Sequence, residues 1–446
     1  MSMSVIQRSL VALGSFVAAV GCGASDPSGV EPGRETGACV DDECLGDLMC
    51  LSDLCVDPEA TPGSGGPDQD DGPGDEGVVP LTSVSVLVVL DNSGTMGEEQ
   101  ALLARALGGV AEALTKAKLD WRIGITTTDV GNPWCNNTTP EAGNLVLTSC
   151  RSRPDAFYFT GATTIDVYNE TCASACPAQW SDFTTIPTSI DGVVGRASRS
   201  WVQSIDGASN LPAGLSVGDA FACLAPQGID GCGFESPLEA MHRAIAHTEL
   251  PGGDNEGFLP QGALLAVILV TDEADCSVNM EYDTIFMPDG GRVFWSDLDL
   301  PAPTSAVCWN AGVQCFGAEC ASADYDVMGN PVAPVDAADR AVLHPVARYA
   351  EQLDGLDGAL VTVIAGAQAD GSVVYELDPA DDLFVRDFGV SPGCRSVGGP
   401  AVPPVRMREL AEQFALDGEQ NLASICDPSY EPAFTPLFNA IVRRLR

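Results

Sequence analysis

Continuous apolar runs, separated by polar and amphipathic stretches, are the main pattern of the chain from residue 83 onward. The runs at 86–90, 264–270 and 359–365 have the length and the β-branched content of strands that are buried on both faces. The stretch 121–127 (WRIGITT) has the same character. The pattern therefore predicts four strands inside a sheet.

Apolar residues at helical spacing lie between these runs. Residues 97–116, 237–247 and 336–353 are predicted to be helical, the last with a break at Pro345, and a final helix ends the chain. Strands that alternate with helices predict an α/β fold, with a mostly parallel central sheet covered by helices on both faces. In such folds ligands bind in the crevice beyond the carboxyl ends of the strands.

Three long segments, 131–215, 276–335 and 377–402, are irregular and rich in Gly, Pro, Asn and Cys. The chain has 17 cysteines, far more than is usual for a cytosolic protein, which indicates an oxidising compartment. Most of the 12 cysteines beyond residue 83 lie in these segments. We expect disulfides to stabilise them as insertions that lack cores of their own.

The amino-terminal residues 1–21 have the pattern of a secretory signal: a short start with Arg8, an apolar stretch and small residues at the end. Residues 19–22 (AVGC) resemble a bacterial lipobox, which implies cleavage before Cys22 and a lipid on its thiol. The alternative is ordinary secretion with an incidental cysteine. We expect membrane attachment through the lipid only, at the outer membrane or cell surface, because Gly23 replaces an inner-membrane retention Asp.

Three small regions are expected between the lipid and the large domain. Residues 22–38 are predicted to be a tether, 39–55 a cysteine-rich module and 56–82 a flexible linker of Pro, Gly and acidic residues. The module has four cysteines, which favour two disulfides over the alternative of a zinc site. These are Cys39, Cys44, Cys50 and Cys55. Residues 83–446 then form the α/β domain with its insertions.

The net charge of −42 comes from 63 acidic and 21 basic residues. Nucleic acid is excluded as a partner, because binding phosphates needs clustered Lys and Arg, and the sequence has no such cluster. An acidic surface keeps a protein soluble and attracts divalent cations.

The first apolar run ends in three oxygen-bearing side chains at alternate positions: Asp91, Ser93 and Thr95. Alternate residues of an extended loop can converge on one point. A carboxylate and two hydroxyls are hard ligands, suited to Mg²⁺, Mn²⁺ or Ca²⁺. The alternative is that the three side chains only cap the following helix.

This arrangement resembles the DxSxS motif of von Willebrand factor type A (VWA) domains, with Thr95 in place of the second serine. The resemblance implies a metal-ion-dependent adhesion site that accepts an acidic residue of a protein ligand. It also implies Asp272, at the end of the run 264–270, as a further metal ligand. Glu235 resembles the metal-coordinating glutamate of the integrin β-subunit variant; otherwise it is an acid that a helix dipole stabilises. VTDEADCS (270–277) and the overall plan also resemble lipoproteins of myxobacterial type.

Two acids follow the motif directly, Glu98 and Glu99. In integrin β subunits, acids at these offsets help to form an adjacent metal site, so the resemblance implies a second metal site here. Acids in the first turn of a helix are also ordinary partners of its dipole, and this interpretation is favoured.

Taken together, these features predict a binding module of the cell envelope rather than an enzyme. One alternative is an extracytoplasmic hydrolase that uses the inserted segments; the sequence GLSVG (214–218) fits a hydrolase motif around Ser216 by its letters, but no apolar strand precedes it. The other alternative is an envelope scaffold that needs no metal.

Overall fold

The computed structural model describes residues 49–51, 54–56, 80–135, 137–160, 164–189, 196–416 and 418–446. The chain divides into two compact units, 1–76 and 77–446. The predicted signal 1–21, the lipidated Cys22, the tether 22–38 and most of the module 39–55 and linker 56–82 lie outside the described residues. In the first unit, β1 (Met49–Leu51) and β2 (Leu54–Val56) pair antiparallel.

The second unit is built on a seven-stranded sheet in the order β10-β9-β4-β3-β11-β14-β17. Five neighbouring strands, from β4 to β17, run parallel, and β9 pairs antiparallel with β4. The strands are β3 (Ser83–Leu90), β4 (Asp120–Thr127), β9 (Val202–Ile205), β10 (Ala208–Ser209), β11 (Ala263–Val270), β14 (Ala359–Ala365) and β17 (Leu422–Ser424). The four apolar runs of the sequence are the four central strands, which confirms the predicted α/β fold.

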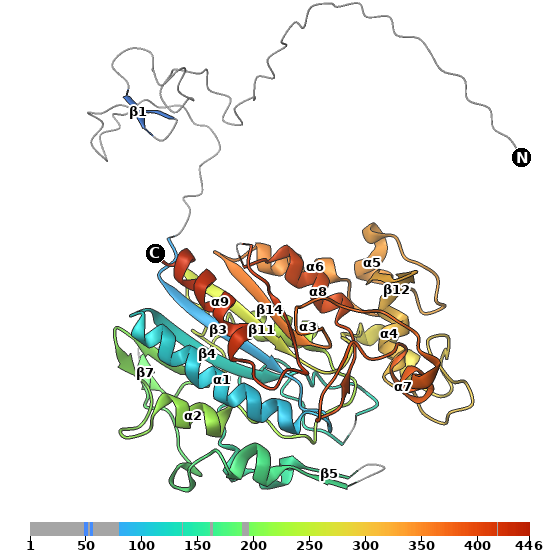
Figure 1. The fold of residues 1–446 in the computed structure, drawn as a ribbon, viewed down its shortest axis with the longest axis horizontal. Helices are drawn as coiled ribbons and strands as arrows, with labels where there is room; N and C mark the ends of the chain where they lie inside the picture. The colour runs from blue at the N-terminus through green and yellow to red at the C-terminus, as the bar shows by residue number, and fades with distance from the viewer. Residues whose placement is uncertain are drawn as a thin grey trace, which may run out of the picture. The chain divides into compact units, whose positions relative to one another are not determined.

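Helices cover both faces of this sheet (Figure 1). One apolar core joins the sheet to α1 (Gly97–Lys116), α2 (Val217–Leu224) and α9 (Glu431–Arg444). The opposite core joins it to α3 (Pro237–His247), α6 (Val346–Asp354) and α8 (Val405–Gln413). Every residue of β3 and β11 is buried, because each strand has a neighbour on both edges and helices on both faces.

The predicted helix 336–353 is divided in two, as the proline indicated. Helix α5 (Pro334–Arg340) ends before the proline, and α6 begins directly after it, with Pro345 at its N-cap position. None of the helices in the described ranges has both the length and the apolar character that crossing a bilayer requires.

The three irregular segments carry only short elements. Their helices are α4 (Ala306–Gly312) and α7 (Asp382–Phe388), with short helical stretches at Cys150–Ser152, Pro154–Phe157, Asn169–Ala173, Ala178–Trp180, Met280–Phe286 and Pro379–Asp381. Their strands form hairpins: β5 (Tyr158–Thr160) with β6 (Thr164–Asp166), β7 (Thr188–Ser189) with β8 (Arg196–Ala197), β12 (Val313–Phe316) with β13 (Glu319–Ser322), and β15 (Cys394–Arg395) with β16 (Pro400–Ala401).

Disulfides hold these insertions in place, as predicted. The pairs among the described residues are Cys135–Cys232, Cys150–Cys172, Cys176–Cys223, Cys276–Cys308, Cys315–Cys320 and Cys394–Cys426. Together they use all 12 cysteines beyond residue 83. Ordering a long insertion costs conformational entropy, which an insertion without its own core offsets poorly. A disulfide removes part of this entropic cost.

A buried ion pair fixes the loop that follows β11. The carboxylate of Asp275 lies 2.8 Å from the guanidinium of Arg406 on α8, and both side chains are almost completely buried. Asp275 also accepts hydrogen bonds from the Leu238 amide of α3 and the Ser277 hydroxyl. The loop is therefore tied to two helices on the same face of the sheet.

Replacing Arg406 with leucine should lower the free energy of unfolding by about 3–5 kcal/mol, because Asp275 would remain as a buried carboxylate without its counter-charge. Urea unfolding followed by circular dichroism measures the change. Arg408→Leu is the matched control on the same helix: its partner Glu412 is exposed, so we expect a loss below about 1 kcal/mol. Equal losses in the two variants would contradict this account of the loop.

Candidate functional site

Asp91 stands at the carboxyl end of the central strand β3. Its amide donates to the carbonyl oxygen of Val270 at 2.9 Å, which continues the ladder between β3 and β11. One carboxylate oxygen accepts the amide of Ser93 at 2.7 Å, and the other accepts the hydroxyl of Thr271 at 2.5 Å. The side chain is completely buried and its direction is fixed by hydrogen bonds from two neighbouring strand ends.

Three other predicted residues lie beside it. The hydroxyl oxygens of Ser93 and Thr95 are 3.4 Å apart. Thr95 hydrogen bonds to the carboxylate of Asp272, which is half-buried and has one oxygen, Oδ1, without a hydrogen-bond partner. The motif and the end of β11 thus meet at one point of the sheet edge.

These side chains do not cap the helix that follows. Helix α1 has Met96 at its N-cap position, and no side chain accepts a hydrogen bond there. The structure therefore contradicts the alternative interpretation that the side chains of the motif cap the following helix.

Glu235 approaches from the loop before α3 and is completely buried. One carboxylate oxygen accepts a hydrogen bond from the hydroxyl of Thr128, directly after β4, and the other, Oε1, has no partner. The first-turn acid of α3 is Glu239, and the first-turn amides of Leu238 and Glu239 donate to the side chains of Asp275 and Ser277. Glu235 is therefore oriented by a neighbouring strand end rather than by the helix amides.

The electrostatics of this cluster are dominated by burial. Burial raises the pKa of Asp91, Asp272, Glu235 and Glu273 above their ordinary values. The charge of Asp91 raises the pKa of the other three carboxyls further. Each charged group that shifts these four pKa values is another carboxylate, and none is an Arg, Lys or His. The site is thus a concentration of buried acids, and no positive group among the described residues is a leading cause of their pKa shifts.

Several residues of this cluster were not singled out in the sequence. Thr271 orients Asp91, Thr128 orients Glu235, and Glu273 adds a further buried acid. Asp129, next to Thr128, is buried with its Oδ2 atom unpartnered. The signal was present in the sequence, because Thr128 and Asp129 follow the run 121–127 directly, just as polar residues follow β3 and β11.

Glu98 and Glu99, the predicted second metal site, have different surroundings. Glu98 is exposed, whereas Glu99 is only 6% exposed and its Oε2 atom has no partner. The hairpin β15–β16 covers this point so closely that a Cβ atom on Gly398 would lie 2.5 Å from Glu99 Oε1. Burial, followed by the nearby charges of Glu98 and Asp91, raises the pKa of Glu99 to about 7.

Ser216 of the hydrolase-like sequence has a structural role. It is the N-cap residue of α2, where its hydroxyl accepts the amide of Asp219 at 3.0 Å. That contact accounts for the Ser-x-x-Asp spacing as a helix start.

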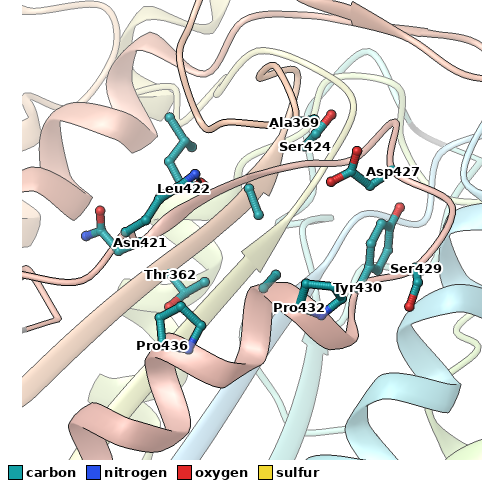
Figure 2. A pocket seen from close by; sticks show the side chains of 13 residues that line it. Thr362, Ala369, Asn421, Leu422, Ser424, Asp427, Ser429, Tyr430, Pro432 and Pro436 are labelled. Carbon is teal, nitrogen blue, oxygen red and sulfur yellow. Dashed lines mark hydrogen bonds between the residues drawn. The ribbon is translucent and has the colours of Figure 1, made fainter.

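A separate cavity of about 140 Å³ lies between β14, β17 and the first turns of α9 (Figure 2). Its lining includes Thr362, whose buried hydroxyl has no partner, and Tyr430, whose hydroxyl donates to the carbonyl oxygen of Ile425. The cavity contains none of the predicted site residues. It is small compared with ligand pockets, which hold about 300–1,000 Å³, and suits water.

Comparisons with protein-family models, with curated proteins and with solved structures find no match for this chain. Within the described part of the chain, no group of three or more His, Cys, Asp or Glu residues is arranged to hold a metal ion. The three predicted carboxylates, Asp91, Glu235 and Asp272, therefore do not form such a group in this structure.

Replacing Glu99 with glutamine should remove a pH dependence of stability in the metal-free protein. A carboxyl whose pKa is raised in the folded state stabilises the fold below about pH 4.5, and this contribution is lost as the pH rises to about 7. The variant, which is neutral at every pH, should therefore match the wild type at pH 4 and exceed its free energy of unfolding by about 3 kcal/mol at pH 8.

Urea unfolding in EDTA at both pH values measures this difference. Glu98→Gln is the matched control, since it removes the adjacent exposed carboxylate. If the free energy of unfolding of Glu99→Gln depended on pH as that of the wild type does, burial would not be what raises the pKa of Glu99.

Proposed function

We propose that residues 83–446 form a VWA-type domain that binds a protein ligand through a divalent cation. The observation that carries the proposal is the set of buried carboxyl groups near the carboxyl ends of the central strands. Among the described residues, no positive group is a leading cause of their raised pKa values. Isolated buried charges cost several kcal/mol each, so such a cluster needs either protons or a cation. A cation neutralises it at neutral pH and gives the acids a function.

The donor atoms fit a hard divalent ion such as Mg²⁺, Mn²⁺ or Ca²⁺. Asp91, Ser93, Thr95 and Asp272 supply carboxylate and hydroxyl oxygens from two adjacent strand ends, and Glu235 adds a third carboxylate. Asp272 Oδ1 and Glu235 Oε1 are without hydrogen-bond partners, which leaves both atoms free to bind an ion. The bound cation would supply an electrophilic position that accepts a carboxylate of the ligand.

The neutral hydroxyls are important for this role. Ser93 and Thr95 contribute oxygen atoms without adding negative charge, so the cation keeps part of its attraction for an external acid. A site made only of carboxylates would satisfy the ion within the protein. This balance favours ligand binding over a purely structural metal site.

The proposed location is the outside of the cell membrane, with Cys22 as a lipid anchor. The complete pairing of the 12 described cysteines supports an oxidising compartment. Such a protein would present the domain to partners in the envelope or on a neighbouring surface.

Replacing Asp91 with alanine should abolish saturable Mn²⁺ binding, measured by isothermal titration calorimetry, because the central carboxylate is lost. In the wild type, Mn²⁺ at 100 times its Kd should stabilise the fold by about 2.7 kcal/mol, and the variant should gain nothing. Asp155→Ala is the control, since Asp155 is exposed and lies outside the site.

Circular dichroism of Asp91→Ala should match that of the wild type, which separates loss of the ion from loss of the fold. Wild-type protein that binds none of Mg²⁺, Mn²⁺ and Ca²⁺ would refute the metal site and favour a metal-independent scaffold. Binding that survives in Asp91→Ala would place the ion elsewhere.

A further inference from the structure

A groove with a volume of about 490 Å³ opens beside the motif. One wall is the first part of α1, and the other comes from the insertion that contains β6 and the following turn. Figure 1 shows this insertion, marked by β5, beside the amino-terminal end of α1. The lining includes Thr95 of the candidate metal site, so the groove and that site are continuous.

The insertion is held firmly against α1. The Thr171 hydroxyl donates to the Gly97 carbonyl oxygen at 2.7 Å, and Val167 packs so closely that a Cβ atom on Gly97 would lie 2.8 Å from it. Disulfides Cys150–Cys172 and Cys176–Cys223 fix the base of the same insertion. The groove is therefore preorganised, which lowers the entropic cost of binding.

The groove combines an aliphatic floor with charged walls. Leu102, Ile165 and Val167 supply the apolar surface. Glu98 and Glu170 line it from opposite sides, both are exposed, and no ion pair between described residues includes either of them. This combination matches a Lys or Arg side chain, which has an aliphatic stem and a cationic head.

Arg105 limits where such a side chain can lie. It lines the groove seven residues after Glu98 on α1, which is about 10 Å further along the helix axis. Its charge repels a second cation, so the cationic head is favoured at the end of the groove nearest Thr95. The net charge of −42 also attracts a basic partner over a long range.

We infer that this groove binds a basic side chain of the protein ligand, adjacent in the ligand to the acidic residue that reaches the metal site. The inference rests on the proposed function for the acidic residue. The expected ligand segment therefore has a Lys or Arg within about two positions of its acidic residue. The two residues must be close in sequence because the groove adjoins the candidate metal site and an extended chain advances only about 3.3 Å per residue.

A displayed library of random heptapeptides, selected on the purified protein in Mn²⁺, tests this specificity. Sequencing of the wild-type selection should show enrichment of peptides with a Lys or Arg within two positions of an Asp or Glu. Glu170→Gln should bind the most enriched peptide about two- to fivefold more weakly, as expected for loss of one exposed charge pair. Mn²⁺ binding by calorimetry should be unchanged in this variant.

Asp166→Asn is the matched control. Asp166 lies on the same strand as Ile165, on the opposite side, and the asparagine retains the oxygen that accepts the Tyr168 amide. This variant should bind as the wild type does. Replacing the basic residue of the peptide with norleucine should weaken binding to the wild type and remove the difference between wild type and Glu170→Gln.

Enrichment of acidic peptides without a neighbouring base would overturn the inference and leave the proposed function in place. Equal binding by the wild type and Glu170→Gln would overturn it as well. A wild-type selection that enriches neither residue type, or bases alone, would contradict both the inference and the proposed function.

Discussion

The structure depends on one unfavourable condition: carboxylates from separate strand ends are buried together at the carboxyl edge of the sheet. No positive group among the described residues is a leading cause of the pKa shifts of Asp91, Asp272 and Glu235, and their side-chain hydrogen bonds come from neutral Thr and Ser groups. Since desolvation favours the neutral acid, the cluster must hold protons or a cation. A nearby acid, Asp275, has a buried arginine partner, whereas no ion pair between described residues includes Asp91, Asp272 or Glu235.

Keeping like charges close together requires a rigid frame. The parallel ladder between β3 and β11 places Asp91 and Asp272 beside one another, because paired strands of equal length end at the same edge. The ion pair of Asp275 holds the next loop, and disulfides hold the insertions that surround the crevice. Two of these disulfides, Cys150–Cys172 and Cys176–Cys223, also hold the insertion that forms one wall of the groove beside α1. The shape of the groove and the tolerance of the buried acids thus depend on the same kind of contacts.

The central strands and long helices were predictable because burial on both faces, or on one helical face, leaves a clear apolar period. The short outer strands β9, β10 and β17 were not predicted, since runs of two to four residues have no measurable period. Asp91, Ser93, Thr95 and Asp272 were recognisable as polar residues that follow central strands. Thr128 and Asp129 have the same signal and were overlooked, because no motif drew attention to that strand end.

Local sequence was sufficient for the α/β class, for the disulfide-rich insertions and for placing Asp91 and Asp272 at the ends of β3 and β11. It could not give the cysteine pairing, which depends on distant segments that meet only in the folded chain. Nor could it distinguish Glu98 from Glu99, which are chemically identical neighbours. The hairpin around Gly398 buries one and leaves the other in the groove. Desolvation depends on what packs against a side chain, and that contact comes from a segment about 300 residues away.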